Sequence, residues 1–366
     1  MDYVKGIQAA RRDLHVAIET FQRPPPQPLV ISPYLAMSLL QKAIRRGRTE
    51  LAFQAAATLL EQSPERLWRR LACIAFEDVG IGDLDVVAQT TAAMAGKRVR
   101  ASLGGEWAVA SYLTTRMTDA TKCRAADDLL LIAENHPAFE GQRLELGSST
   151  TQRLIGVLTS TQPLAVTALA AWFLLGTDRR PSPRLARRRG DIDALFAVLG
   201  EILPPDLIEI TREGHRRSGE VLPIFMALLA PYLRDELTCV QADEMPADAM
   251  AGAVPGFCVD VYTRPGRAGL AKFIEGSTET ARWIRAHIPP RQRITFLGTV
   301  VFRLDGQCVR RRLRWPIADE LRRAVDYECN GQHCPDATEI LGLARADLGE
   351  LNAIRAEVME GLSHVR

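Results

Sequence analysis

Apolar residues in the first quarter of the chain recur with the period of an amphipathic helix. Between Ser32 and Gly47 they occupy positions i, i+3, i+4, i+7 and i+8, and they are Ala36, Leu39, Leu40, Ala43 and Ile44. This spacing places them on one face of a helix. Ser32 followed by Pro33 is typical of a helix N-terminus, and Gly47 of a C-terminus. Two further stripes, over 52–60 and 67–75, predict a second and a third short helix packed antiparallel to their neighbours.

Helical patterning continues through most of the remaining sequence. We predict a helix over 2–22, an extended connector at the proline run 23–28, and a helix from the capping residue Asp83 to Ala95. The stretch Leu164–Gly176 is almost entirely apolar, which predicts a buried helix. It is shorter than the roughly 20 residues that a membrane span needs. We therefore expect no membrane association.

Two segments break the helical pattern. Residues 177–191 contain two prolines and six arginines, which predicts a mobile basic linker. Residues 293–315 hold two β-rich runs around Asp305-Gly306, a favoured turn pair, and predict a β-hairpin. We thus expect a mainly α fold with a helical-bundle or collar-like domain at 1–177, a linker at 178–190, and a second helical domain at 191–366 carrying the small hairpin.

The composition is that of an ordinary globular protein with a net charge of only +2. A positive surface must therefore come from local arrangement. The seven cysteines are scattered and the first residues lack an apolar signal core, so we expect a cytoplasmic protein. Cys329, His333 and Cys334 are too few for a zinc site without a second ligand pair, and we expect no metal.

Residues 32–83 carry an unusual pairing of motifs. Their features are a basic helix end (Lys42, Ile44, Arg45, Gly47) and then Arg69, Arg70, Leu71, Ile74, Ala75, Glu77, Asp78, Val79 and Gly80. This run resembles the helical region behind the ATPase module in the RarA/MgsA family of replication-associated recombination ATPases, which are relatives of the clamp loaders. The resemblance covers about a seventh of the chain. It implies a collar-like helical scaffold that serves oligomerisation beside a DNA-engaging ATPase ring.

The chain departs from that family in one decisive respect. It has no G-x-x-x-x-G-K-[ST] phosphate loop, and its only Gly-Lys pair, Gly96-Lys97, lacks the upstream glycine and the following Ser or Thr. Without that loop no backbone amides and no lysine are placed to hold the nucleotide phosphates. ATP hydrolysis is therefore not implied, and we expect no cofactor.

Three basic groups are candidates for contact with nucleic acid. They are Lys42, Arg45, Arg46 and Arg48; Arg179, Arg180, Arg184, Arg187, Arg188 and Arg189; and Arg310, Arg311, Arg312 and Arg314 with Trp315, which could stack on a base. The first group is also explained in part by capping of a helix C-terminus, the second by a solvated linker, and the third by charges that protect an edge strand. Arg69, Arg70, Glu77 and Asp78 form either a partner-docking surface or, as we prefer, an internal ion-pair network.

These observations favour a non-catalytic accessory protein of DNA replication, repair or mobile-element maintenance. It would bind the phosphate backbone of nucleic acid, most readily DNA, without reading its sequence. The alternative is a scaffold or adaptor that forms homo-oligomers or serves a separate ATPase without touching DNA. An enzyme, such as a nuclease with dispersed carboxylate ligands, is the third possibility, although no G-x-S-x-G or H-E-x-x-H motif occurs.

Overall fold

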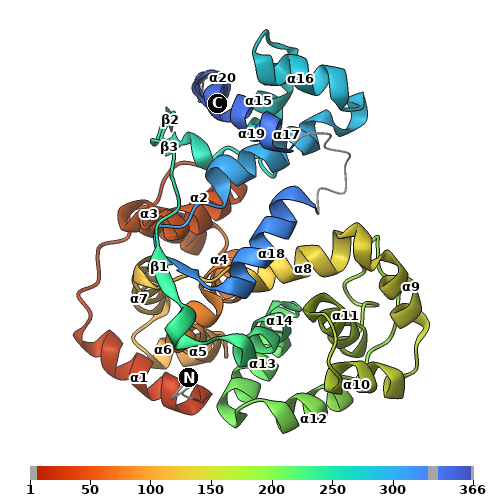
Figure 1. Ribbon diagram of the computed structural model, residues 1–366. Coiled ribbons are helices and arrows are strands. Elements are labelled where there is room, and N and C mark those ends of the chain that lie inside the picture. The colour runs from red at the N-terminus through yellow and green to blue at the C-terminus, as the bar shows by residue number, and fades with distance from the viewer. Residues whose placement is uncertain (1–5, 329–336, 364–366) are drawn as a thin grey trace. The chain divides into compact units, whose positions relative to one another are not determined.

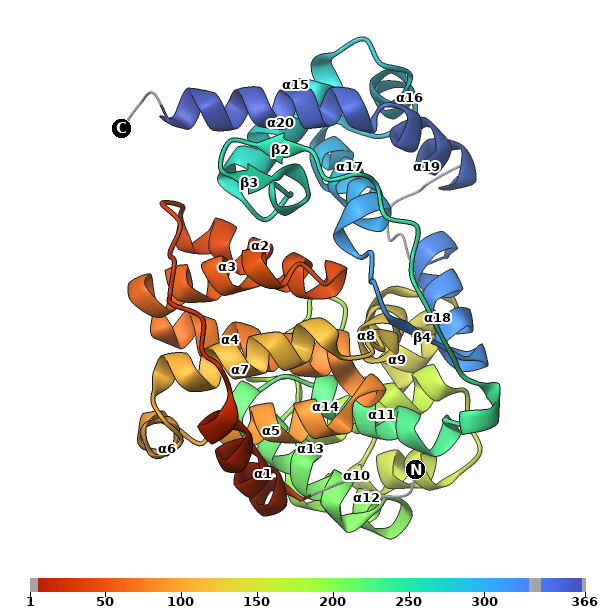
Figure 2. The same cartoon turned by 90° about the vertical axis from the view of Figure 1, so that its left-hand side faces the viewer.

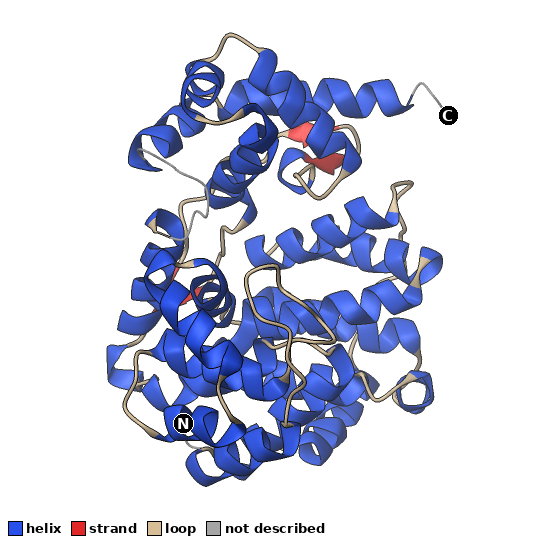
Figure 3. Cartoon of the chain, turned by 90° about the vertical axis from the view of Figure 1, so that its right-hand side faces the viewer, coloured by secondary structure: helices blue, strands red, loops and turns tan. Residues whose placement is uncertain are grey.

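The computed structural model describes residues 6–328 and 337–363, and it confirms the mainly helical class (Figures 1 and 3). The chain divides into two compact units, each assembled from separate stretches of sequence. Unit 1 comprises Met1–Gln22, Leu71–Gln241 and Arg312–Gly331, and unit 2 comprises Arg23–Arg70, Ala242–Arg311 and Gln332–Arg366. Residues 178–190 thus lie inside unit 1, whereas the sequence suggested that they separate two domains.

Unit 1 is built almost entirely from helices. Its elements are α1 (Ile7–Thr20), the π-helical turn η1 (Ala75–Val79), η2 (Gly80–Gly82), α5 (Leu84–Ala93), α6 (Lys97–Ser102), α7 (Glu106–Asp119), α8 (Ala125–Asn135), η3 (Pro137–Phe139), α9 (Glu140–Ser148), α10 (Thr151–Thr159), α11 (Leu164–Leu175), α12 (Ile192–Ile202), α13 (Pro205–Ser218), α14 (Leu222–Leu229), η4 (Ala230–Tyr232), η5 (Asp235–Leu237), β1 (Cys239–Gln241), β4 (Arg312–Arg314) and α18 (Pro316–Tyr327).

The apolar helix α11 lies in the middle of this unit, as its sequence predicted. It packs against α8, α9, α10, α12 and α14 (Figure 1). All its residues from Ala165 to Leu175 are buried except Thr167. A helix that is apolar all round must be covered by its surroundings, and these five neighbours cover most of its surface. Trp172 completes the packing with an edge-to-face contact to Phe225, with 5.7 Å between ring centroids.

Unit 2 combines the helices of the 32–62 stretch with a C-terminal group. Its elements are α2 (Pro33–Arg46), α3 (Thr49–Gln62), β2 (Met250–Ala251), β3 (Val254–Pro255), η6 (Gly256–Cys258), α15 (Arg264–Glu275), α16 (Glu279–His287), η7 (Pro290–Gln292), α17 (Arg293–Val301), the π-helical turn η8 (Phe302–Gly306), α19 (Ala337–Ala346) and α20 (Leu348–Ser363). Helix α4 (Pro64–Ile74) contains the boundary between the units. α2 packs on α3, and α20 runs alongside α15 (Figure 2).

The helix start and stop signals act as the sequence predicted. The Ser32 hydroxyl accepts a hydrogen bond from the Leu35 amide, and Gly47 ends α2 in the left-handed conformation with φ 69°. Asp83 caps α5 by accepting from the Val86 amide at 3.1 Å. Local capping chemistry therefore fixes these boundaries.

The predicted hairpin at 293–315 is wrong in its position. Residues 293–306 are helical, forming α17 and η8. Their buried apolar residues are Phe296, Leu297, Val300, Val301 and Leu304. This spacing is helical, and the core that surrounds it overrides the strand preference of the β-branched residues.

The short strands lie elsewhere. The small antiparallel hairpin of unit 2 joins β2 to β3, pairing Met250 with Pro255. In unit 1, β4 pairs with β1 through Cys239 and Arg314. None of the described helices is both long and apolar enough to cross a membrane.

Candidate functional site

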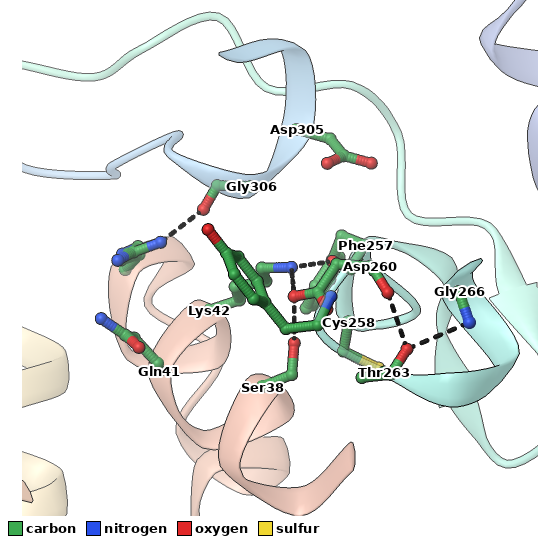
Figure 4. Close-up of polar contacts among 12 residues, drawn as sticks. Ser38, Gln41, Lys42, Phe257, Cys258, Asp260, Thr263, Gly266, Asp305 and Gly306 are labelled. Carbon is green, nitrogen blue, oxygen red and sulfur yellow. Dashed lines mark hydrogen bonds and ion pairs between the residues drawn. The ribbon is translucent and has the colours of Figure 1, made fainter. Parts of the chain in front are cut away.

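The basic end of α2 is buried within unit 2, so its prediction as a nucleic-acid contact is wrong. Lys42, Arg45 and Arg46 are only 2–4% exposed. The Lys42 ammonium donates to the Asp260 carboxylate at 2.6 Å and to the Phe257 carbonyl at 2.7 Å (Figure 4). These side chains are surrounded by the chain's own acceptors, and a phosphate cannot reach them.

The surroundings of Asp260 favour its ionised form beside Lys42. Its carboxylate also accepts from the Ser38 hydroxyl at 2.8 Å (Figure 4) and from the Tyr262 amide at 2.9 Å. Burial favours the neutral acid most strongly, but Lys42 and these hydrogen bonds outweigh it and lower the pKa of Asp260. The pair therefore joins α2 to the start of α15 as two charges, and it leaves no free base for proton transfer.

The neighbouring arginines hold backbone and acid groups from the 246–306 part of unit 2. Arg45 donates to the Gly306 carbonyl at 2.8 Å, and Arg46 to the Asp305 carbonyl at 3.0 Å. Asp248 accepts from Arg46 at 3.2 Å and from the exposed Arg48 at 2.8 Å. The hydrogen bonds and ion pairs of these arginines thus hold η8 and the 246–248 segment against α2.

The third basic group is also mostly unavailable. Arg310 and Arg311 are exposed, but Arg312 is 5% and Trp315 is 2% exposed. Arg314 forms an ion pair with Asp319. The reason is that β4 lies between β1 and the Lys122 backbone, whose carbonyl accepts from the Leu313 amide at 2.8 Å. Trp315 therefore cannot stack on a base, contrary to the prediction.

Glu77 and Asp78 form an internal ion-pair network, but with a partner that the sequence did not suggest. Both pair with the guanidinium of Arg124, which also binds Asp127. Arg124 is 2% exposed, and the four carboxylates around it outweigh its burial and raise its pKa.

The two arginines of the same motif lie outside this network. Arg70 donates instead to the Gln41 side chain at 2.8 Å, and Arg69 is exposed. The pairing of Arg70 with Glu77 that the helical spacing suggested is therefore wrong.

The glycine after Val79 lets Arg124 approach the motif. Gly80 has φ 51°, and a side chain there would lie 2.7 Å from the Cys123 carbonyl. The Cys123 amide in turn donates to the Val79 carbonyl at 3.0 Å. The glycine that ends the Glu-Asp-Val-Gly sequence thus allows the 121–124 segment to pack against η1.

Asp128, an acid next to this network, has a pKa above its ordinary value. Asp128 is 5% exposed, and burial raises its pKa to about 6 despite the nearby Arg124 and Arg312. The buried thiols Cys123 and Cys258 also have raised pKa values, that of Cys258 to about 12. A buried thiol with so high a pKa stays protonated at neutral pH and is a poor nucleophile.

No group of three or more potential metal ligands comes together anywhere in residues 6–328 and 337–363. Cys329, His333 and Cys334 lie outside the described residues.

The arginine segment is a closed loop rather than an open linker. In this arginine loop, residues 177–190, the amides of Thr177 and Asp178 donate to the Arg188 carbonyl at 2.9 and 3.1 Å. The Thr177 hydroxyl donates to the Ala186 carbonyl at 2.6 Å, and Leu185 is buried. The loop therefore has the form of an Ω-loop, with its ends tied and a side chain packed inside.

The closed loop presents most of its arginines to solvent. Arg180 pairs with Glu220, and Arg188 donates to the Ser149 carbonyl. The other four are exposed, and their guanidinium groups make no hydrogen bond or ion pair with any residue that the structure describes; they are Arg179, Arg184, Arg187 and Arg189. Of the three predicted basic groups, this one remains accessible.

A groove of about 1000 Å³ opens beside the loop, entirely within unit 1. Its volume is at the upper end of those of small-molecule sites. We call it the loop groove, and its lining includes Glu134, Trp172, Asp178, Arg179, Arg189, Asp191, Asp193, Phe196, Arg212 and Glu220. The guanidinium of Arg212 lies over the Phe196 ring, 4.7 Å from its centroid. The lining therefore combines exposed charged groups with two rings, Trp172 and Phe196, that are largely buried.

Several of these residues were not identified from the sequence. Trp172 was assigned only to a buried helix and Phe196 only to helical patterning, and Arg212 was not singled out. One signal was present: Arg212 and Arg216 are one turn apart on α13 and form a basic face close in sequence to the loop.

We compared the chain with known proteins. No protein-family model, no curated protein and no solved structure matches it.

Proposed function

We propose that this protein is a non-catalytic binding protein that holds the phosphate backbone of nucleic acid on the arginine loop. One observation supports the proposal most directly. Arg179, Arg184, Arg187 and Arg189 are exposed without an acid partner among the described residues, whereas the cations of α2 are neutralised within unit 2. Because the backbone of the loop is already ordered, binding a phosphate orders only the arginine side chains and not the loop itself.

Such contacts give affinity without sequence preference. Each arginine that neutralises a phosphate releases a condensed counterion, and the affinity then falls as salt rises. DNA is the ligand that we favour, because residues 32–83 resemble the helical region of the RarA/MgsA ATPases. That resemblance also supports a role in replication or repair, with a separate chain as the ATPase. A scaffold that binds only proteins is the competing function.

A salt titration of DNA binding tests the proposal. Fluorescence anisotropy with a labelled oligonucleotide should give a log–log slope of about −2.8 for a single strand if all four arginines contact phosphates. The variant with Arg179, Arg184, Arg187 and Arg189 changed to glutamine should lose most of this slope.

The matched control removes the same charge from exposed arginines of the same unit: Arg11, Arg12, Arg98 and Arg234 changed to glutamine. It should keep nearly the full slope. Equal losses in both variants would mean that net charge, and not the loop, attracts DNA. No binding at low salt would reject the proposal and leave the protein scaffold.

A further inference from the structure

Strand β1 is an open edge of the small sheet in unit 1 (Figure 1). Among the described residues it pairs only with β4, with Val240 opposite Leu313. All three residues of β1 are exposed, and Val240 is 52% exposed. β4, by contrast, is paired on both of its sides, with β1 and with the backbone at Lys122. The sheet therefore ends at β1, where a further strand can be added.

The hydrogen bonds of β4 show which backbone groups of β1 face outward. The Leu313 amide donates to the Lys122 carbonyl at 2.8 Å, so the N–H and C=O of Leu313 point away from β1. In an antiparallel ladder the residue opposite such a position is also turned away from the pairing. This residue is Val240, whose N–H and C=O have no partner in the part of the chain that the structure describes. β1 thus presents one donor and one acceptor side by side at its outer edge.

These two groups are complementary to the same two groups on a second copy of the chain. When two β1 strands lie antiparallel with one Val240 opposite the other, each Val240 amide donates to the carbonyl of the opposite Val240. Residues 238–242 carry no charge, so this pairing brings no like charges together. They also include no lysine or proline of the kind that protects exposed edge strands.

Exposed apolar side chains lie close to this edge in the sequence. Tyr232 is 44% and Leu237 is 57% exposed, and they precede β1 by a few residues. A two-stranded ribbon is marginal by itself, and it gains stability when further strands extend it. The surroundings of Val240 therefore favour the addition of a strand.

We infer that this chain forms a symmetric dimer in which the two β1 strands pair along their outer edges. The product is a continuous four-stranded sheet in the order β4, β1, β1, β4. None of the residues involved belongs to 32–83, the stretch that resembles the helical region of the RarA/MgsA ATPases. The pairing is also independent of nucleic-acid binding by the arginine loop.

Sedimentation velocity without nucleic acid, over a range of chain concentrations, measures the assembly. We expect the native chain to change from the mass of one chain to the mass of two as its concentration rises. Val240→Pro removes the outward N–H but leaves the bonds between β1 and β4, which use Cys239 and Gln241. It should raise the dissociation constant of the dimer at least about tenfold, because both central hydrogen bonds are lost.

Val240→Thr is the matched control for this variant. Threonine keeps the N–H and the branched shape of valine, so Val240→Thr should dimerise with nearly the native dissociation constant. Circular dichroism confirms that both variants are folded.

A disulfide cross-link tests the register of the pairing. With the two Val240 residues opposite each other, Cys239 of one chain lies opposite Gln241 of the other. They form a non-hydrogen-bonded pair with Cα atoms about 4.5 Å apart, a separation that a disulfide can bridge. Gln241→Cys should therefore give a covalent dimer on a non-reducing gel after mild oxidation. The control Cys239→Ser with Gln241→Cys should give none, because each new thiol then faces a serine.

Three results would overturn the inference. They are a native chain that stays monomeric at every concentration, a native dissociation constant in Val240→Pro, and the absence of a cross-link in Gln241→Cys. None of them bears on phosphate binding by the arginine loop, which the salt titration tests separately.

Discussion

Replacing Lys42 by methionine tests whether the basic end of α2 is part of the core of unit 2. Methionine keeps most of the length of the side chain but removes its charge, which leaves the Asp260 carboxylate largely buried without a cation. Removing one partner of a buried ion pair costs about 3–5 kcal/mol. We expect the lower end, about 3 kcal/mol, because Ser38 and the Tyr262 amide still donate to Asp260.

Urea unfolding followed by far-UV circular dichroism measures this loss. In thermal unfolding of a unit of this size, the melting temperature should fall by about 2–4 °C per kcal/mol. The double variant Lys42→Met with Asp260→Asn should recover most of the stability, because no buried charge is left unpaired. Single-strand affinity should match that of the native chain in both variants.

The pH dependence supplies a second check on the same pair. The lowered pKa of Asp260 means that its contribution to stability is present above the ordinary value of 3.8 and is lost as the pH falls through the lowered pKa. In Lys42→Met the carboxylate loses the cation that lowers its pKa, so the variant's loss of stability relative to the native chain should shrink as the pH falls and Asp260 takes up a proton. Unchanged stability together with weakened DNA binding would refute the assignment of Lys42 to the core.

Two further substitutions probe unit 1. The pKa of Asp128, about 6, is above the ordinary value of 3.8. The protonated group therefore stabilises the fold fully below pH 3.8, and this contribution is lost as the pH rises through 6. The full shift of the pKa corresponds to about 3 kcal/mol. Asp128→Asn should therefore remove this part of the pH dependence between pH 4 and 8 in chemical unfolding, and a variant that follows the native curve would contradict the assignment. Gly190→Ala places a methyl group against the Leu175 backbone at the base of the arginine loop, and it should cost about 1–3 kcal/mol. It should also weaken DNA binding by disturbing the loop. Gly200→Ala, at an open position inside α12, should leave DNA binding unchanged and raise the stability by up to about 1 kcal/mol.

Local chemistry allowed much of the helical fold to be predicted. The stripe of α2 with its Ser32 and Gly47 ends, the Asp83 cap and the buried α11 all depend on residues close together in the sequence. The error at 293–315 came from giving Asp305-Gly306 and the β-branched residues more weight than the helical spacing of Phe296, Val300 and Leu304. The periodicity was the better guide there because these residues are covered by a core.

The candidate site was harder to predict because the partners of charged residues are distant in sequence. Lys42 and Asp260 are 218 positions apart, and Arg124 is 46 positions from Asp78. Nothing in the local pattern distinguishes a cation that will be buried beside such an acid from one that will face solvent. The groove posed the same difficulty, since its lining is shared among several elements: α11 contributes two residues, and α12 and α13 contribute three each.

The location of a basic run relative to the helices explains which run stays accessible. The cations of α2 lie on a helix that packs against η6 and η8, so their side chains are buried. Buried cations are stable only when acids and carbonyl groups pair with them, and these segments provide such partners. The arginine loop is closed by its own backbone and has a single buried apolar anchor, Leu185, so the arginines around that anchor have no interior to enter. The chain has 46 basic and 44 acidic residues, so its charges can largely pair with one another. An exposed positive surface remains where the fold keeps arginines away from acids and carbonyl groups, as it does in the arginine loop.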